Sequence, residues 1–126
     1  MGIRGWGRTR DEAFAQAALA LVAVSTDLAL VATRDLVQVD CQAGDEEMLL
    51  YVWLNAVVYQ MATGKMLFGQ FKVETTGTGL HGEMLGEPVD VERHQPAVEV
   101  KAATVTCLRV ARDPGGAWFA QCVVDV

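Results

Sequence analysis

The chain has 126 residues, of which 52% are hydrophobic and 21% are charged, and its formal net charge at pH 7 is −6. This length is typical of a single domain, and the hydrophobic content is too high for a disordered chain. The excess of Asp and Glu repels phosphate, so composition argues against direct nucleic-acid binding and favours a protein partner or a cation.

The first predicted element is a helix from Arg10 to Ser25. Apolar residues recur there at helical spacing, after the capping box formed by Thr9 and Glu12. Its uncharged stretch, residues 13–26, is shorter than the roughly 20 apolar residues of a membrane span. Acidic residues at the start of this stretch also argue against a signal peptide. We therefore predict a cytoplasmic protein without a membrane segment.

A short strand over residues 36–40 precedes a second predicted helix, which begins at the acidic run 45–47 and ends at Gly64. Acidic residues are favourable in the first turn of a helix, and the apolar residues on nearly all its sides predict burial on two faces. After Lys65 the hydrophobic period changes to 2, which predicts strands over residues 66–75, 80–86, 98–112 and 118–126.

These elements predict an α+β fold in one domain, residues 1–126: a two-layer sandwich of two helices packed on a mixed, mainly antiparallel β-sheet. The three cysteines, Cys41, Cys107 and Cys122, are odd in number and lack CxxC spacing. We expect three buried, unreactive thiols, with neither a disulfide framework nor a thiolate zinc site.

The last two residues concentrate hard oxygen ligands, because the Asp125 carboxylate adjoins the carbonyl and carboxylate of Val126. Oxygen-only sets select Ca²⁺ or Mg²⁺ over zinc. The alternative interpretation is a solvated chain end without a bound ion.

Lys101 and Glu99 are expected on the same face of the strand over 98–112, because strand side chains alternate between faces. As an exposed ion pair they would add only ~0 to 1 kcal/mol to stability. Asp90 and His94 lie in a proline-bounded loop. They either orient each other as a general base or hydrogen-bond the backbone of their own loop, and the lack of a nearby Ser or Cys nucleophile favours the second interpretation.

Three segments together resemble the archease family. They are residues 2–9 (GIRGWGRT) ahead of an alanine-rich helix, residues 86–96 (GEPVDVERHQP), and residues 99–104 (EVKAAT). Archeases are small non-enzymatic accessory proteins of the GTP-dependent, RtcB-type tRNA-splicing ligase. The resemblance covers nearly the whole chain. It implies a non-catalytic cofactor that engages this RNA ligase and promotes its guanylylation by GTP, and so its multiple turnover in tRNA processing.

The resemblance also implies site residues. In archeases an aspartate near the C-terminal end and the residue after it bind a metal ion, which carries over to Asp125 and Val126 with Ca²⁺ as the expected ion. Lys101 matches a functional lysine near that end, and Asp90, His94 and Glu99 are further candidates for partner contact.

Two departures from the family affect these expectations. The family's upstream His-Thr-Ala-Asp segment, whose aspartate joins the metal site, would end where this sequence begins with Met1. We therefore expect weak Ca²⁺ binding, and a mis-assigned start codon is one hypothesis for the gap. The family's Thr-Tyr-His sequence is also changed, because Val105 and Thr106 follow Thr104.

Two other functions stay open. One is a small metal-dependent hydrolase using Asp90, His94 and Asp125, and the other is a chaperone-like module with a broader set of partners. Turnover of a generic phosphoester would favour the hydrolase, whereas a ligase gene beside this one would favour the accessory protein.

Overall fold

The computed structural model describes all 126 residues. Three α-helices are present: α1 (Arg10–Ser25), α2 (Glu46–Gly64) and the single-turn α3 (Val91–His94). A 3₁₀ turn, η1 (Leu28–Leu30), follows α1. The strands are β1 (Gly2–Gly7), β2 (Asp35–Gln42), β3 (Met66–Thr76), β4 (Gly79–Pro88), β5 (Ala102–Ala103), β6 (Arg109–Arg112) and β7 (Trp118–Asp125).

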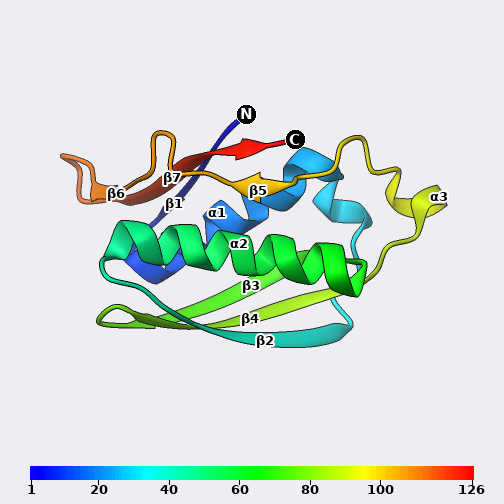
Figure 1. Ribbon diagram of the computed structural model, residues 1–126, viewed down its shortest axis with the longest axis horizontal. Helices are drawn as coiled ribbons and strands as arrows, with labels where there is room; N and C mark the ends of the chain where they lie inside the picture. Colours follow the sequence, from blue (N-terminus) through cyan, green and yellow to red (C-terminus); the bar gives the residue numbers. More distant parts are fainter.

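The strands form two antiparallel sheets, and α1 and α2 lie between them (Figure 1). One sheet has the order β1-β7-β5, with β6 also paired to β7, and the other has the order β2-β4-β3. The expected α+β sandwich is confirmed. In place of one sheet there are two, because β7 pairs with β1, β5 and β6 while β4 pairs only with β2 and β3.

Side-chain caps begin both long helices. Thr9 Oγ1 accepts the Glu12 amide at 3.1 Å, as the capping box predicted. Asp45 Oδ1 accepts the Met48 amide at 2.8 Å, so the acidic run supplies a cap as well as favourable charge. None of the helices has the length and apolar content that crossing a bilayer requires.

The helix α2 ends at Gly64, as predicted, but the left-handed residue that caps it is Lys65 and not the glycine. Gly64 is the last helical residue, and Lys65 takes the left-handed conformation with φ of 50°. The strand β3 begins at the next residue, Met66, so the turn from helix to strand is made at Lys65 alone. A non-glycine residue at this position carries some backbone strain.

At two glycines in the sheets, a helix packs so close to the strand that no side chain would fit. Trp53 of α2 is fully buried, and its indole N–H donates to the Phe14 carbonyl of α1 at 3.1 Å. Its ring lies against Gly82 of β4, where a Cβ would come within 2.3 Å of the indole. At Gly5 of β1 a Cβ would come within 2.1 Å of the Ala17 amide nitrogen in α1. These contacts fix each helix against one sheet.

The predicted strand over residues 98–112 was wrong. Residues 95–101 have no regular structure, and only the short β5 and β6 are strands in this region. The Thr104 amide still donates to the Val123 carbonyl of β7 at 2.9 Å, but the pairing ends there because the Thr104 hydroxyl accepts the Thr106 amide at 3.2 Å. Cys107 then adopts φ of 54° and is exposed, which corrects the expectation of three buried thiols.

Candidate functional site

The end of β7 brings together two of the residues singled out in the sequence. Ala102 pairs with Asp125, and the Lys101 amide donates to the Asp125 carbonyl at 2.8 Å. Both side chains are exposed, and neither takes part in any ion pair of the structure. Their charges are therefore available to a binding partner. Val126 follows with 47% of its surface exposed.

The acidic residues do not complete a metal site at this end. The chain contains no group of three or more His, Cys, Asp or Glu side chains placed to hold a metal ion. Asp125 and Val126 alone fall short of the 6 to 8 oxygens that Ca²⁺ takes. Calcium binding here stays a prediction. The same finding means that Asp90, His94 and Asp125 do not form the metal cluster that the hydrolase alternative requires.

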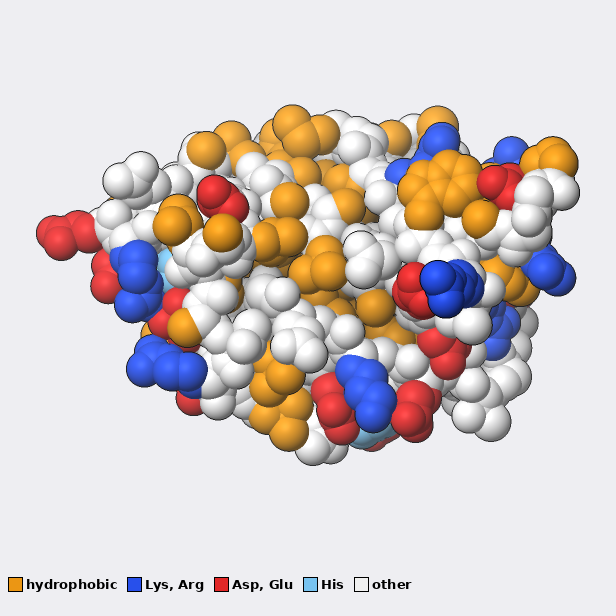
Figure 2. Space-filling view, turned by 180° about the vertical axis from the view of Figure 1, so that it is seen from behind, with side chains coloured by type: hydrophobic (Ala, Val, Ile, Leu, Met, Phe, Trp, Pro, Cys, Tyr) orange, Lys and Arg blue, Asp and Glu red, His pale blue; other side chains and the backbone are white.

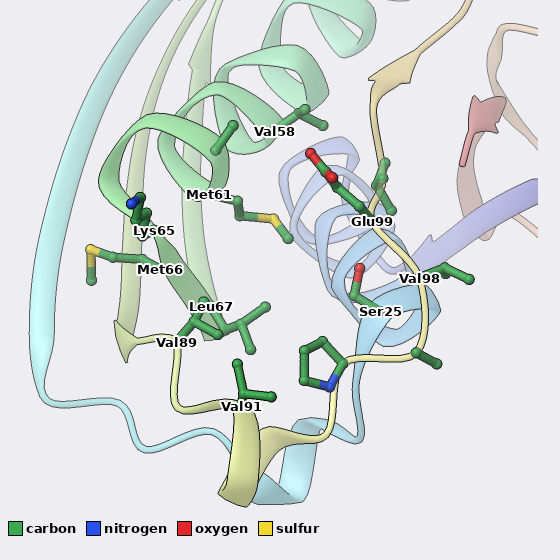
Figure 3. A pocket seen from close by; sticks show the side chains of 14 residues that line it. Ser25, Val58, Met61, Lys65, Met66, Leu67, Val89, Val91, Val98 and Glu99 are labelled. Atoms are coloured by element: carbon green, nitrogen blue, oxygen red, sulfur yellow. The ribbon is translucent and has the colours of Figure 1, made fainter.

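Glu99 does not pair with Lys101, contrary to the solvated-pair interpretation, because the strand that would align them is absent. Glu99 instead lines a groove of about 540 Å³ beside the end of α2 (Figure 3). The lining is mainly apolar, with Met61, Leu67 and Val91 among its members and Lys65 as its one cation.

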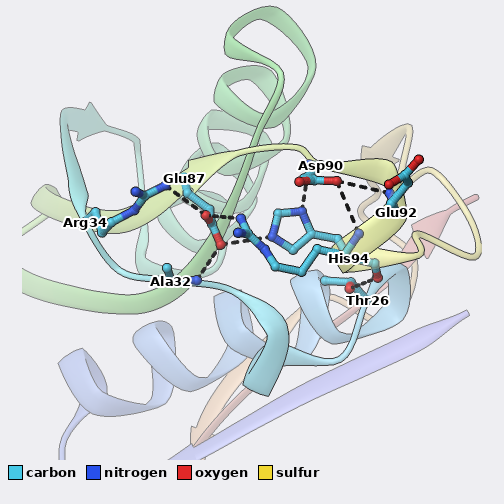
Figure 4. Close-up of polar contacts among 8 residues, drawn as sticks. Thr26, Ala32, Arg34, Glu87, Asp90, Glu92 and His94 are labelled. Carbon is cyan, nitrogen blue, oxygen red and sulfur yellow. Dashed lines mark hydrogen bonds and ion pairs between the residues drawn. The ribbon is translucent and has the colours of Figure 1, made fainter.

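A buried polar cluster is built around Glu87, whose side chain is fully buried at the end of β4 (Figure 4). Its Oε2 accepts the Ala32 amide at 2.6 Å and Nε2–H of His94 at 3.0 Å. Its Oε1 accepts from Arg34 at 3.2 Å and also from Arg93. Four donors thus satisfy this carboxylate, which removes the usual cost of burying a charge.

His94 has a defined tautomer. Its Nδ1 accepts the Asp90 amide at 2.9 Å, so the ring proton lies on Nε2 and points at Glu87. The Asp90 carboxylate accepts the amides of Glu92 and Arg93 at 3.1 and 3.2 Å, as the cap of α3. Asp90 and His94 therefore hydrogen-bond the backbone of their own loop, and the Asp90 carboxylate does not orient the imidazole as a base.

These hydrogen bonds keep Glu87 ionised. The Ala32 amide above all, and then the bond from His94, lower the pKa of Glu87 from 4.5 to about 2. A carboxylate with so low a pKa is a poor general base near pH 7. The cluster therefore ties the segment after α1 and the α3 loop to β4, and we assign it a structural role.

Sequence reasoning missed the burial of Glu87. Alternation along β4 places it on the outward face with His81 and Glu83, opposite the buried Met84. It is covered only because Arg34 and His94 arrive from distant segments. The quoted motif contained Glu87, but no local signal marked it as buried.

The two buried thiols are poor nucleophiles. Burial raises the pKa of Cys41 and of Cys122. A raised pKa keeps both sulfurs protonated near neutral pH, and the thiolate is the reactive form.

Comparison with known proteins decides the family. The model of the Archease protein family (MTH1598/TM1083) matches residues 1–126. The chain belongs to the archease family. The archease of Pyrococcus furiosus is 36% identical over 130 residues, an alignment that covers 100% of this chain and 92% of that protein. The expected family is thereby confirmed, and it agrees with a non-catalytic protein.

Two solved structures resemble this archease. Protein 1598 of Methanobacterium thermoautotrophicum superposes with a TM-score of 0.79 at 30% identity, covering 99% of this chain and 91% of that one. An archease of Thermotoga maritima, described as a possible chaperone, superposes with a TM-score of 0.68 at 13% identity, covering 100% and 90%. The second comparison supports the fold alone.

Proposed function

We propose that this archease is a non-catalytic cofactor of a GTP-dependent, RtcB-type tRNA-splicing ligase, whose guanylylation and multiple turnover it promotes. Its membership of the archease family over the whole chain is the observation that carries the proposal. The guanylate would be carried by the ligase. This archease would act by binding, in keeping with a cluster at Glu87 whose donors and acceptors are already used within the fold.

We expect the surface that contacts the ligase to include the C-terminal end of β7. Lys101 and Asp125 present opposite charges from neighbouring positions of the β5–β7 pair, and both lack partners within the chain. Unpaired exposed charges can pair across an interface without first breaking an internal ion pair. Asp125 and Val126 offer only part of an oxygen set for Ca²⁺, so no metal enters the proposed action.

The test is a ligase guanylylation assay with labelled GTP, in limiting ligase and without RNA. We expect this archease to raise the yield of guanylylated ligase over several turnovers. Lys101→Ala should abolish most of that increase. The matched control is Lys72→Ala, which removes another exposed lysine, from β3, and should stimulate like the parent.

The rival interpretation is a general chaperone. It predicts that this archease prevents heat aggregation of unrelated proteins and that guanylylation by well-folded ligase does not change. The proposed contact would be contradicted if the parent did not stimulate ligase guanylylation. It would also be contradicted if folded Lys101→Ala stimulated guanylylation as well as the parent does.

A further inference from the structure

The outer face of the β1-β7-β6 sheet carries arginine and aromatic side chains, although the chain as a whole is acidic. Alternation along β1 buries Ile3 and Gly5 and turns Arg4 and Trp6 outward. By the strand registers, Arg4 and Arg109 flank Gln121 of β7, and Trp6 is beside Phe119. We call Arg4, Trp6, Arg109 and Phe119 the arginine–aromatic face.

Phe119 contacts each of the other three side chains. The ring centroids of Trp6 and Phe119 are 5.3 Å apart. The Arg4 guanidinium lies 5.7 Å from the Trp6 centroid and 5.5 Å from that of Phe119, and the Arg109 guanidinium lies 5.4 Å from Phe119 on the other side of β7. Such cation–π contacts orient the guanidinium groups while leaving their N–H donors free.

These groups are accessible, and the strands that carry them hold a single carboxylate, although Glu12 of α1 lines a hollow beside Trp6. Trp6 is 46% exposed. Arg4 uses only its Nε–H, which donates to Gln121 at 2.9 Å, and Arg109 makes no side-chain hydrogen bond or ion pair. The one carboxylate in β1, β6 or β7 is Asp125, six residues along β7 from Phe119 and therefore ~20 Å away. Seen from behind, the end of the molecule that carries β6 shows several basic side chains around a large hydrophobic one, with acidic side chains among them (Figure 2).

We propose that the arginine–aromatic face binds single-stranded nucleic acid. A base would stack on the exposed ring of Trp6, and the free N–H donors of Arg4 and Arg109 would contact phosphates on the two sides of β7. Aromatic rings on an antiparallel sheet, flanked by arginines, are how small domains hold unstacked bases. An acidic peptide would use the two arginines alone and give the exposed indole no role.

The proposal revises the expectation drawn from net charge. A net charge of −6 averages over the whole surface, whereas a nucleic-acid strand responds to charges within about 8 to 10 Å at moderate salt. The face also exists without the ligase, so the proposal is independent of the proposed function.

The experiment is fluorescence anisotropy of a labelled oligouridylate of about 12 nucleotides, titrated with the full chain and no ligase. We expect saturable binding whose log K falls with log salt at a slope of about −1.4, for two neutralised phosphates. Trp6→Ala should weaken binding about fivefold or more through lost stacking. Arg109→Gln should bring the slope to about −0.7.

Two controls match these variants. Tyr59→Ala removes an aromatic that is 62% exposed on α2, and Lys72→Gln removes one exposed cation from the other sheet. Both should bind like the parent. No binding by the parent near 50 mM salt, or equal loss in the controls, would overturn the proposal. Full binding by Trp6→Ala, together with displacement of the RNA by an oligoglutamate peptide, would overturn it in favour of an acidic protein partner.

Discussion

Replacing Gly5 by alanine tests whether β1 and α1 pack backbone against backbone. A Cβ at Gly5 would lie 2.1 Å from the Ala17 nitrogen, 2.5 Å from the Ala13 carbonyl oxygen and 2.6 Å from the Gln16 carbonyl carbon. Non-bonded heavy atoms prefer separations of ~3.5 to 4.0 Å, so β1 and α1 would have to separate by more than ~1 Å. All three obstructing atoms belong to the helix backbone, and no side chain can rotate to relieve the clash.

Overpacking of this kind typically destabilises by ~1 to 3 kcal/mol, and an obstructing backbone puts Gly5→Ala at the upper end. The unfolding entropy of a chain this long is ~0.26 kcal/mol per degree, so about 3 kcal/mol corresponds to a Tm roughly 10 °C lower. Thermal unfolding followed by circular dichroism would measure the change.

Gly2→Ala is the matched control within the same strand. A Cβ at Gly2 meets no atom within 4 Å, so the Tm should change by no more than the equivalent of ~0.5 kcal/mol. If Gly5→Ala melts as close to the parent as Gly2→Ala does, the packing of β1 on α1 is looser than described and the reasoning fails.

Three further predictions concern charge. Because the pKa of Glu87 is lowered to about 2, its contribution to stability should be present above pH 4.5 and lost as the pH falls toward 2. In urea unfolding measured at a series of pH values, Glu87→Gln should therefore reduce the dependence of the free energy of unfolding on pH between 4.5 and 2. The hydrogen bond with Asp40 raises the pKa of His81 above 6.5. This pair should therefore stabilise the fold below pH 6.5, and its contribution should be lost as the pH rises through the raised pKa. Proton NMR of His81 in the Asp40→Asn variant should show its pKa returning toward 6.5. Calorimetry should find only weak Ca²⁺ binding by this chain, and Asp125→Asn should weaken it further because it removes the one side-chain carboxylate of the expected site. Tight binding, or binding that Asp125→Asn leaves unchanged, would show that the ion has ligands other than those proposed.

The parts of the fold that sequence predicted depend on neighbours in the chain. Thr9 and Asp45 cap helices whose amides lie three residues away, so composition and spacing were sufficient to place both helix starts. The burial of Glu87 depends on Arg34 and His94, which arrive from other segments and reverse what alternation in β4 implies. Likewise the strand predicted over 98–112 had suitable residues, but the Thr104 hydroxyl accepts the Thr106 amide, which a continued ladder with β7 would have used.

The two proposed surfaces can be tested separately because β7 holds them apart. Phe119 belongs to the arginine–aromatic face near one end of this strand, and Asp125 lies beside Lys101 at the other end. Six residues of strand separate them by ~20 Å, about twice the Debye length at moderate salt, so a charge change at one end has little electrostatic effect at the other. Arg109→Gln should therefore leave RNA-free ligase guanylylation unchanged, and Lys101→Ala should leave oligouridylate binding unchanged. If either variant impairs both activities while its Tm is unaltered, the two surfaces form one continuous interface.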